Sequence, residues 1–328
     1  MTDRENTNSR ATGLSYEEAA VETAKEIKRL LRGAPTVIRG ITAHLAKAAG
    51  KMIRARALLA CALRADGTVN PDAVKAAAAA ELLHLATLVH DDIIDDADKR
   101  RGIETVHRKF GEKYAVLCGD YLFCTALELV STVNTLESRS SSLDRTFPHY
   151  LTEVCLGELR QNSNDFNYAL SEREYYKIIR GKTAALFEAC FYIGFLFSDE
   201  PEAMRSLYTE VGNNVGIIFQ LNDDCADYAS TLKQSKKPVL SDYGRGVITL
   251  PLIYAMKKDA VLRERAAKGI PPEELKLAVT AAGGLAYTYA KIEGLYKKTL
   301  KVIEAMELGE AKQELLTQLL RKSAGKAV

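Results

Sequence analysis

The sequence predicts an all-α protein that folds as one large helical bundle. Apolar residues recur at helical spacing along nearly the whole chain of 328 residues, and no stretch alternates apolar and polar residues as a half-buried strand would. The breaks between helical stretches are short, such as 65–71 and 268–274, and none is long enough to link two domains. We therefore expect one domain of about a dozen helices at residues 14–328, after a polar, disordered lead-in at residues 1–13.

The first two well-marked helices lie in the amino-terminal third of the chain. Residues 16–31 carry apolar side chains toward one side and predict an amphipathic helix. A longer helix is expected to begin with Asn70 as its N-cap and Pro71 at its first helical position, where a proline costs no hydrogen bond. This helix runs for more than twenty residues and ends in a cluster of aspartates.

A third helical stretch begins at Ser171, with Glu174 three residues later in capping-box spacing. It ends in the apolar run 189–197, which is the longest in the chain. That run is too short to cross a bilayer, so we expect it to be a buried helix, and we expect no transmembrane segment.

Charge and cysteine content narrow the class of function. Hydrophobic residues make up 47% and charged residues 27% of the chain, as in ordinary soluble proteins. A net charge of +2 is small for a protein that binds nucleic acid, because such proteins carry a concentrated basic face. The six cysteines form no CxxC pair, which favours free thiols in a reducing compartment. We therefore expect a cytoplasmic protein that binds no nucleic acid.

Two clusters of aspartates follow apolar helical stretches. The stretch LVHDDIIDDADKRRG holds Asp91, Asp92, Asp95 and Asp96, and the stretch FQLNDDCADY holds Asp223, Asp224 and Asp227. Aspartates four residues apart lie on one face of a helix and repel each other, and at a helix C-terminus they also oppose the helix dipole. Bound divalent cations would remove both penalties. Mg²⁺ suits this purpose because it takes one or two carboxylates together with waters and substrate phosphates.

Other interpretations of the acidic clusters are weaker. One such cluster alone would favour a solvated acidic helix end, but two clusters of the same pattern favour metal binding. Neither cluster has the loop glycine and the twelfth-position glutamate of an EF-hand. A zinc site is disfavoured because these stretches offer few cysteines and histidines.

Basic residues stand near both clusters, where phosphate groups would need them. They are Lys51, Arg54, Arg100, Arg101, Lys182 with its neighbour Thr183, Lys236 and Lys237. Each one alone is more often a solvated surface charge. Taken with the aspartates, they predict an electrostatic cradle in which metal ions and basic side chains neutralise a departing diphosphate.

These motifs resemble those of the trans-isoprenyl diphosphate synthases, most closely the bacterial long-chain polyprenyl type. HDDIIDDADKRRG is similar to the first aspartate-rich motif of that family and QLNDDCAD to the second, and the resemblance covers roughly residues 40–260 in the same order. It implies the isoprenoid synthase fold, a helical bundle with a central cavity. It also implies the head-to-tail condensation of isopentenyl diphosphate with an allylic diphosphate.

The resemblance implies a role for each motif residue. Three Mg²⁺ ions per active site are expected, held by Asp91, Asp92, Asp95, Asp223, Asp224 and Asp227, with Asp91, Asp92, Asp95, Asp223 and Lys182 central to catalysis. Contacts to the allylic diphosphate are expected from Arg100, Lys182, Thr183, Gln220 and Lys237. Contacts to isopentenyl diphosphate, which needs no metal of its own, are expected from Lys51, Arg54, His84 and Arg101. Without the resemblance, His84 would be read as a core histidine.

Several positions depart from the family pattern. The motif GGKRxRP of the family reads AGKMIRA here, so Met52 replaces a basic residue and Ala55 replaces the proline, while Lys51 and Arg54 remain. Val247 stands where the family commonly has a lysine that contacts the allylic diphosphate. Either Arg245 reaches in from two residues away or that contact is missing.

The residues before Asp91 bear on product length. Short-chain members of the family carry aromatic rings four or five residues upstream, where this chain has Thr87 and Ala86. Leu83 is a moderate obstacle one turn deeper, and the run 76–80 is all alanine, which also suits a close contact between helices. We expect a polyprenyl diphosphate longer than about twenty carbons, and a farnesyl or geranylgeranyl diphosphate synthase is the alternative.

Two other functions compete with this interpretation. A class I terpene cyclase also ionises an allylic diphosphate, but it needs no isopentenyl diphosphate site. A non-catalytic partner subunit would typically have eroded acidic motifs, and both are intact here. The resemblance implies a homodimer, and an accessory subunit stays open.

Overall fold

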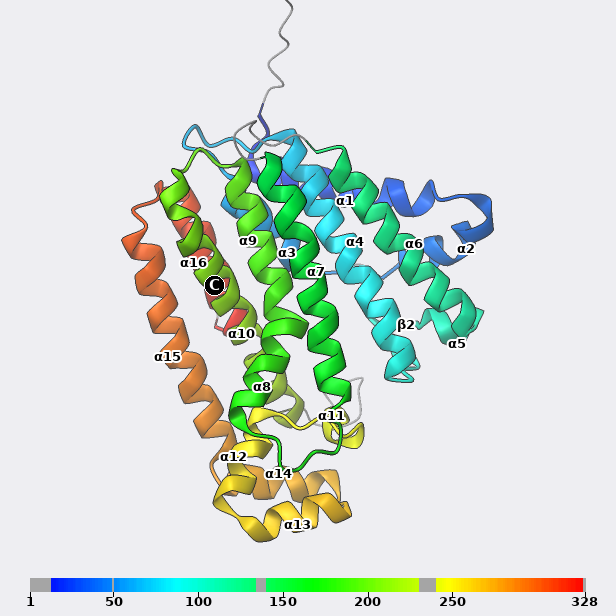
Figure 1. Ribbon diagram of the computed structural model, residues 1–328, viewed down its shortest axis with the longest axis vertical. Coiled ribbons are helices and arrows are strands. Elements are labelled where there is room, and N and C mark those ends of the chain that lie inside the picture. Colours follow the sequence, from blue (N-terminus) through cyan, green and yellow to red (C-terminus); the bar gives the residue numbers. More distant parts are fainter. Residues whose placement is uncertain (1–12, 49, 134–139, 230–239, 327–328) are drawn as a thin grey trace, which may run out of the picture.

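The predicted all-α fold is confirmed in the computed structural model, which describes residues 13–48, 50–133, 140–229 and 240–326 (Figure 1). The lead-in expected at residues 1–13 lies outside these ranges except for Gly13. The helices before the bundle centre are α1 (Tyr16–Arg32), α2 (Thr36–Leu45), α3 (Ile53–Ala62), α4 (Pro71–Ile94), α5 (Val106–Phe110), α6 (Glu112–Ser131) and α7 (Ser140–Asn162). They are followed by α8 (Glu172–Ile179), the π-helical turn η2 (Arg180–Ala184), α9 (Ala185–Phe197), the 3₁₀ turn η3 (Glu202–Met204), α10 (Arg205–Ala229) and α11 (Ser241–Gly244). The last helices are α12 (Leu250–Lys258), α13 (Ala260–Lys268), α14 (Pro272–Ala281), α15 (Gly284–Ala305) and α16 (Glu310–Ser323).

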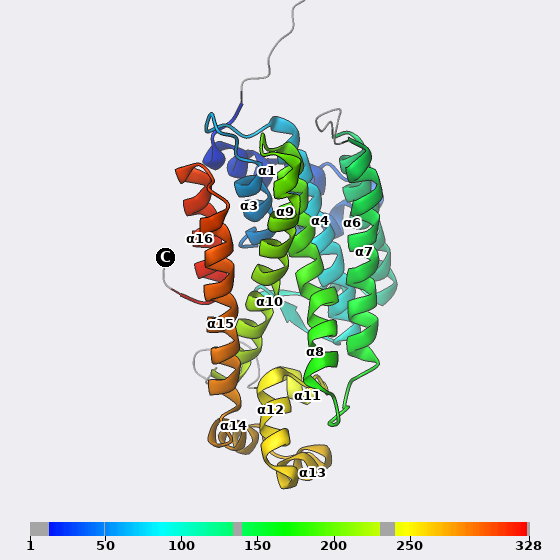
Figure 2. The same cartoon turned by 60° about the vertical axis from the view of Figure 1, so that its left-hand side comes forward.

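The long helices run side by side along one axis and surround α9, as both views of the ribbon show (Figures 1 and 2). Every residue of the apolar run 189–197 is buried, so the prediction of a buried helix there is confirmed. Helices α3, α7 and α10 pack against α9. In the described residues the only strands are β1 (Lys99–Arg100) and β2 (Ile103–Glu104), which pair antiparallel just after α4.

The caps that the sequence predicts are present. The side chain of Asn70 accepts a hydrogen bond from the backbone N–H of Asp72 at 2.9 Å, and Pro71 opens α4. The hydroxyl of Ser171 accepts one from the backbone N–H of Glu174 at 3.2 Å. The reciprocal half of that capping box is replaced, because the Glu174 carboxylate pairs with Lys177 at 2.6 Å. These caps set where α4 and α8 begin, and therefore which residues they present at the far end of the bundle.

Two helices are long and apolar enough to span a bilayer by length and composition, namely α4 and α6. In α4, 67% of the apolar stretch is buried inside the bundle, which is typical of a core helix. In α6, only 33% of the apolar stretch is buried. Helix α6 packs along α4 with one face and leaves an apolar face uncovered. The six cysteines are all free, and four of them are buried.

Candidate active site

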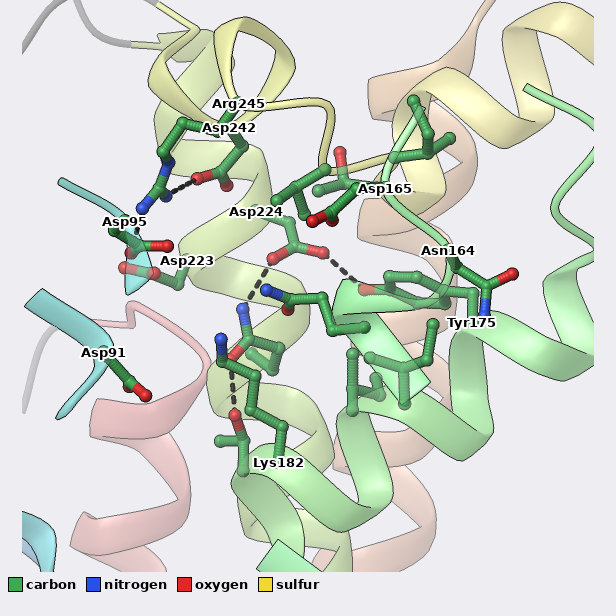
Figure 3. A pocket seen from close by; sticks show the side chains of 18 of the residues that line it. Asp91, Asp95, Asn164, Asp165, Tyr175, Lys182, Asp223, Asp224, Asp242 and Arg245 are labelled. Carbon is green, nitrogen blue, oxygen red and sulfur yellow. Dashed lines mark hydrogen bonds and ion pairs between the residues drawn. The ribbon is translucent and has the colours of Figure 1, made fainter. Parts of the chain in front are cut away.

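The carboxyl ends of α4 and α10 meet at the end of the bundle that also holds α8, η2 and the segment after α11. Between them lies a solvent-open cleft, which we call the acidic cleft (Figure 3). Its lining includes Leu88, Asp91, Asp95, Arg100, Gln161, Asn164, Asp165, Leu170, Tyr175, Ile178, Ile179, Lys182, Thr183, Gln220, Asp223, Asp224, Asp242, Arg245, Val247, Ile248 and Thr249. Residues 132 positions apart in the sequence, such as Asp91 and Asp223, therefore share one site.

The four aspartates of the first cluster point in different directions because α4 ends within it. Asp91 and Asp95 line the acidic cleft. Asp92 is buried at 4% exposure and its carboxylate accepts from Arg100 Nε at 2.6 Å. Asp96 lies beyond the helix with a φ of 48° and turns to Arg108 at the surface, at 2.9 Å.

The second cluster is divided in the same way. Asp223 is exposed in the cleft. Asp224 is buried at 2% exposure, where it accepts hydrogen bonds from the Tyr175 hydroxyl and from Gln220 Nε2, the latter at 2.7 Å. Asp227 accepts from the backbone N–H groups of residues 241 and 242, at 3.3 and 3.2 Å. In this structure Asp224 and Asp227 accept hydrogen bonds from other parts of the protein. Asp91, Asp95 and Asp223 face the cleft, where Asp95 contacts Arg245.

Burial raises the pKa values of Asp91 and Asp224. The pKa of Asp91 rises to about 7, because the carboxyl is buried and lies near the carboxylate of Glu158. Burial raises the pKa of Asp224 to about 8, although the Tyr175 hydrogen bond opposes the shift. Carboxylates packed so closely lack compensating positive charge when they ionise. One Oδ1 atom of Asp165 is also buried without a hydrogen-bond partner.

Lys182 enters the cleft from the π-helical turn η2. A Cβ atom on Gly157 would lie 2.0 Å from the Lys182 backbone N, so only glycine allows α7 to cross η2 this closely. The Lys182 ammonium pairs with Glu158 of α7 at 2.8 Å. Its neighbour Thr183 donates from Oγ1 to Gln220 at 2.6 Å, and Gln220 in turn donates to Asp224. The π turn therefore aims a cation into the cleft and ties it to the second aspartate cluster.

Arg245 lies in the lining of the acidic cleft, and whether it contacts an allylic diphosphate in place of the missing lysine stays a prediction. Its guanidinium contacts Asp95 and also pairs with Asp242 at 2.7 Å (Figure 3). Arg245 thus reaches into the cleft and links α4 to α11, beside Val247 in the lining. Lys237, which the sequence analysis also placed here, lies outside the described residues.

A second cavity, which we call the basic cavity, lies further toward the amino-terminal end of α4 and is lined by Ala24, Ile27, Lys28, Leu31, Leu45, Ala46, Ala48, Gly50, Met52, Glu81, His84, Leu85 and Arg101. The pKa of His84 is held well below its ordinary value by burial and by the charges of Arg54, Arg101 and Arg100. His84 is therefore neutral at pH 7. Lys51 is exposed between the lining residues Gly50 and Met52.

Arg101 lines this basic cavity together with Lys28, and Arg54 lies near the lining residues Glu81 and His84. Arg54 is 9% exposed, stacks on the Phe187 ring at 4.7 Å, and leaves its Nε without a partner. A buried guanidinium with an unused donor is costly unless an anion binds there. A Cβ atom on Gly50 would lie 2.6 Å from Arg101 Nη1, so the glycine makes room for that guanidinium.

The acidic cleft and the basic cavity meet beside α4. A small cavity between them is lined by Leu85, Leu88, Arg100 and Arg101 among others. Leu88 and Arg100 also line the acidic cleft, and Leu85 and Arg101 also line the basic cavity. Two bound diphosphates would each have an arginine of the pair Arg100–Arg101, with apolar side chains between them.

The residues expected to set product length lie on α4 next to this junction. Ala86 and Leu83 are fully buried, and the alanines at 76–80 are all buried as well. Thr87 is half-buried and its hydroxyl donates to the backbone carbonyl of His84 at 2.9 Å. The acidic cleft is lined on α4 by Leu88, Asp91 and Asp95, and does not extend to Thr87 or Ala86 in this structure.

Sequence reasoning missed several residues of these sites. Glu158, Asp165, Tyr175 and Asp242 line or flank the acidic cleft, and Glu81 lines the basic cavity. Each lies in an ordinary helical or loop context with no acidic neighbour at ligand spacing. Asp242 had the clearest signal, since it follows the basic stretch at 236–237 in a segment expected to be a break.

A model of the polyprenyl synthetase family matches residues 35–279, which is most of the chain. The chain belongs to the polyprenyl synthetase family. It is therefore a trans-prenyltransferase of isoprenoid biosynthesis, and dependence on Mg²⁺ is general in its family. The family resemblance seen in the two aspartate motifs is confirmed.

Similar proteins cover between 72% and 96% of the chain. Heptaprenyl diphosphate synthase component 2 of Geobacillus stearothermophilus is 32% identical over 305 residues, which are 91% of this chain and 92% of that protein. A short chain isoprenyl diphosphate synthase of Methanocaldococcus jannaschii is 35% identical over 242 residues, covering 72% of this chain and 73% of that protein. The crystal structure of heptaprenyl diphosphate synthase from Staphylococcus aureus matches with a TM-score of 0.88 and 26% identity, covering 96% of this chain and 100% of that one.

Proposed function

We propose that this protein condenses isopentenyl diphosphate with an allylic diphosphate to make a polyprenyl diphosphate longer than about twenty carbons. The observation that carries the proposal is the meeting of an acidic cleft and a basic cavity beside α4. A terpene cyclase would need the first site but not the second. A non-catalytic subunit would need neither.

The donor set of the acidic cleft fits Mg²⁺. The pKa values of Asp91 and Asp224 are raised, and one buried oxygen of Asp165 has no hydrogen-bond partner, so the cleft is short of positive charge. In the described residues no three acidic, histidine or cysteine side chains converge as a metal site on their own. This suits Mg²⁺ ions that complete their coordination with diphosphate oxygens and water. We propose three such ions, with Asp91, Asp95 and Asp223 as their carboxylate ligands.

The chain's own residues would act as follows. Lys182, Arg100 and Arg245 neutralise the allylic diphosphate as its C–O bond breaks, and the bound metal supplies further positive charge to that leaving group. Leu88, Ile178 and Ile179 keep water from the resulting cation. Arg54, His84 and Arg101 hold the isopentenyl diphosphate so that its double bond forms the new C–C bond. The proton then lost passes to the released diphosphate, so no protein base is required.

Product sizing tests this proposal directly. Pure protein would be incubated with Mg²⁺, isopentenyl diphosphate and either dimethylallyl or farnesyl diphosphate, and the products measured by chain length. We expect polyprenyl diphosphates that incorporate several isopentenyl units. A cyclic hydrocarbon would identify a cyclase, and no product in the presence of both substrates would indicate a partner-dependent subunit. A product that stops at fifteen or twenty carbons would identify a short-chain synthase.

The double variant Ala86→Phe with Thr87→Phe tests where the growing chain lies. If the product passes these positions, the rings fill its path and the product falls to about fifteen carbons. Because Ala86 is fully buried, the rings would otherwise overpack the core, which typically costs ~1–3 kcal/mol. A fall in melting temperature with unchanged product length would therefore contradict the path along α4.

We also propose a homodimer in the cytoplasm, formed through the outer face of α6. Its exposed apolar side chains there are Tyr114, Val116, Leu117 and Leu127. A second copy would cover them at low cost, since an exposed apolar face of this kind marks an association surface. Solution mass at micromolar concentration tests this, with Leu117→Glu expected to give monomers. The Geobacillus relative is named component 2, so an accessory subunit is the alternative. An assembly that forms only when a different chain is added would identify such a subunit.

A further inference from the structure

The basic cavity contains one acidic side chain, that of Glu81, about three helical turns before Asp91 on α4. It is half-buried and shares the cavity with His84 and Arg101. A carboxylate is an unexpected member of a site for an anionic substrate, because it repels the anion. Its place therefore calls for a different explanation from that of the neighbouring cations.

Glu81 supplies a cap that α3 lacks. The residue before α3, Met52, has a left-handed φ of 51° and makes no side-chain capping bond. The first backbone N–H groups of a helix have no partner within the helix and need one from elsewhere. Glu81 Oε1 accepts from the backbone N–H of Ala55, in the first turn of α3, at 3.1 Å. One carboxylate on α4 thus holds the first turn of α3.

The start of α3 carries two of the cations that are expected to contact isopentenyl diphosphate. Lys51 precedes it and Arg54 lies within it, whereas His84 stands three residues after Glu81 on α4. The contact between Glu81 and Ala55 therefore joins the two elements that provide the isopentenyl diphosphate contacts. If α3 shifts against α4, the distance between Arg54 and His84 changes.

The charge of Glu81 also favours the arrangement. Burial lowers the pKa values of Arg54 and Arg101, and in both cases the nearby Glu81 carboxylate opposes that shift. With no substrate bound, the two guanidinium groups would otherwise face each other with no opposite charge in the cavity. Glu81 thus stabilises the site in the form that the substrate must meet.

We propose that Glu81 is a positioning residue for isopentenyl diphosphate: it fixes the first turn of α3 and the guanidinium groups of Arg54 and Arg101 without touching the substrate. The inference rests on the proposed function. It differs in sign from the simple electrostatic expectation, in which removal of a negative charge from an anion site tightens binding. It also predicts an effect on one substrate only, because Glu81 lines the basic cavity and is not in the lining of the acidic cleft.

Two variants separate the cap from the charge. Glu81→Gln keeps an oxygen for the Ala55 N–H and removes the charge, whereas Glu81→Ala removes both. We expect the KM for isopentenyl diphosphate to rise about threefold in the first variant and about tenfold or more in the second. The KM for the allylic substrate is expected to change less than about twofold in either. Glu81→Asp keeps the charge on a shorter side chain and should recover part of the loss.

Equilibrium binding of isopentenyl diphosphate, measured by calorimetry without Mg²⁺, gives a readout that is independent of turnover. Asp72→Asn is the matched control, since it removes one acidic charge from the other end of α4, and its affinity should equal that of the wild type. Equal or tighter binding by Glu81→Gln would overturn the inference, and this variant decides if the alanine variant does not fold. Failure of the wild type itself to condense the two substrates would instead overturn the proposed function.

Discussion

The acidic cleft and the basic cavity both lie along α4 but differ in their balance of charge. In the cleft, the acidic residues Asp91, Asp95, Asp223 and Asp242 outnumber the nearby cations, and burial raises the pKa of Asp91 to about 7. Beside the cavity, buried Arg54 keeps an unused donor, and the one acid in the lining, Glu81, opposes the charges of Arg54 and Arg101. We propose that the cleft needs added cations to bind a diphosphate, whereas the cavity needs only the anion. On that proposal, the cleft takes the substrate that is ionised and the cavity takes the substrate that is only held.

The largest effect is expected at the acidic cleft, where the Mg²⁺ ions are proposed to bind. Asp223→Ala removes a carboxylate that faces the cleft, and kcat/KM should fall by at least ~100-fold, because the charge of the leaving diphosphate is no longer balanced. Asp91→Ala should behave in the same way. Steady-state rates across a range of Mg²⁺ concentrations provide the measurement.

Asp96→Ala is the control for this prediction. Asp96 belongs to the same sequence cluster but turns outward to Arg108. We expect its rate to stay within about twofold of the wild type, as for other exposed surface changes. Near-full activity of Asp223→Ala at limiting Mg²⁺ would contradict the assignment of the cleft.

That control shows what the sequence could and could not predict. Helical spacing and the cap at Asn70 predicted α4 and the site at its end. They did not predict that Asp96 turns to Arg108, because α4 stops at Ile94 and the chain then turns with a positive φ. The termination depends on packing of the following segment, which a local pattern does not contain.

Residues that act through contacts far apart in the chain were also beyond local patterns. Glu158 reaches Lys182 across a crossing that needs Gly157, and Glu81 reaches Ala55 from another helix. The polarity of these residues is visible in the sequence, but their partners follow only from the packing of α3, α4, α7 and η2. The motif residues themselves were predictable because their spacing on one helix already implies a shared face.

An intermediate effect is expected at the junction of the two regions. Arg101 lines the basic cavity, and Arg101→Ala should raise the KM for isopentenyl diphosphate about tenfold. Arg100 lines the acidic cleft and pairs with Asp92, so Arg100→Ala should act mainly on the KM for the allylic substrate. Initial rates with each substrate varied in turn measure the split. Equal effects of both variants on both substrates would show that the two regions are not divided at this pair.

The smallest effect concerns stability in the absence of metal. The ordinary pKa of an aspartate is 3.8, and the folded values are about 7 for Asp91 and about 8 for Asp224. Because the folded protein holds these protons more tightly than the unfolded chain, the stabilisation is complete at acid pH and is lost as pH rises through 7 and 8. The melting temperature of the protein in a chelator should therefore fall by a few degrees between pH 6 and pH 9, measured by calorimetry.

Substitution and metal addition sharpen this last prediction. Asp224→Asn keeps the shape of the buried side chain but cannot ionise, so the fall between pH 6 and pH 9 should be smaller than in the wild type. The same change at exposed Asp96 should leave the dependence of stability on pH as it was, because no buried charge is removed.

Mg²⁺ binds the ionised carboxylates of the cleft, so its stabilising effect should grow with pH over the same range. The basic cavity has no comparable group, since His84 is already neutral, and Arg54→Gln should not alter the slope. If the melting temperatures of Asp224→Asn and the wild type fall equally between pH 6 and pH 9, the raised pKa of Asp224 does not cause that fall. The contrast in charge between the two regions is then weaker than the structure indicates.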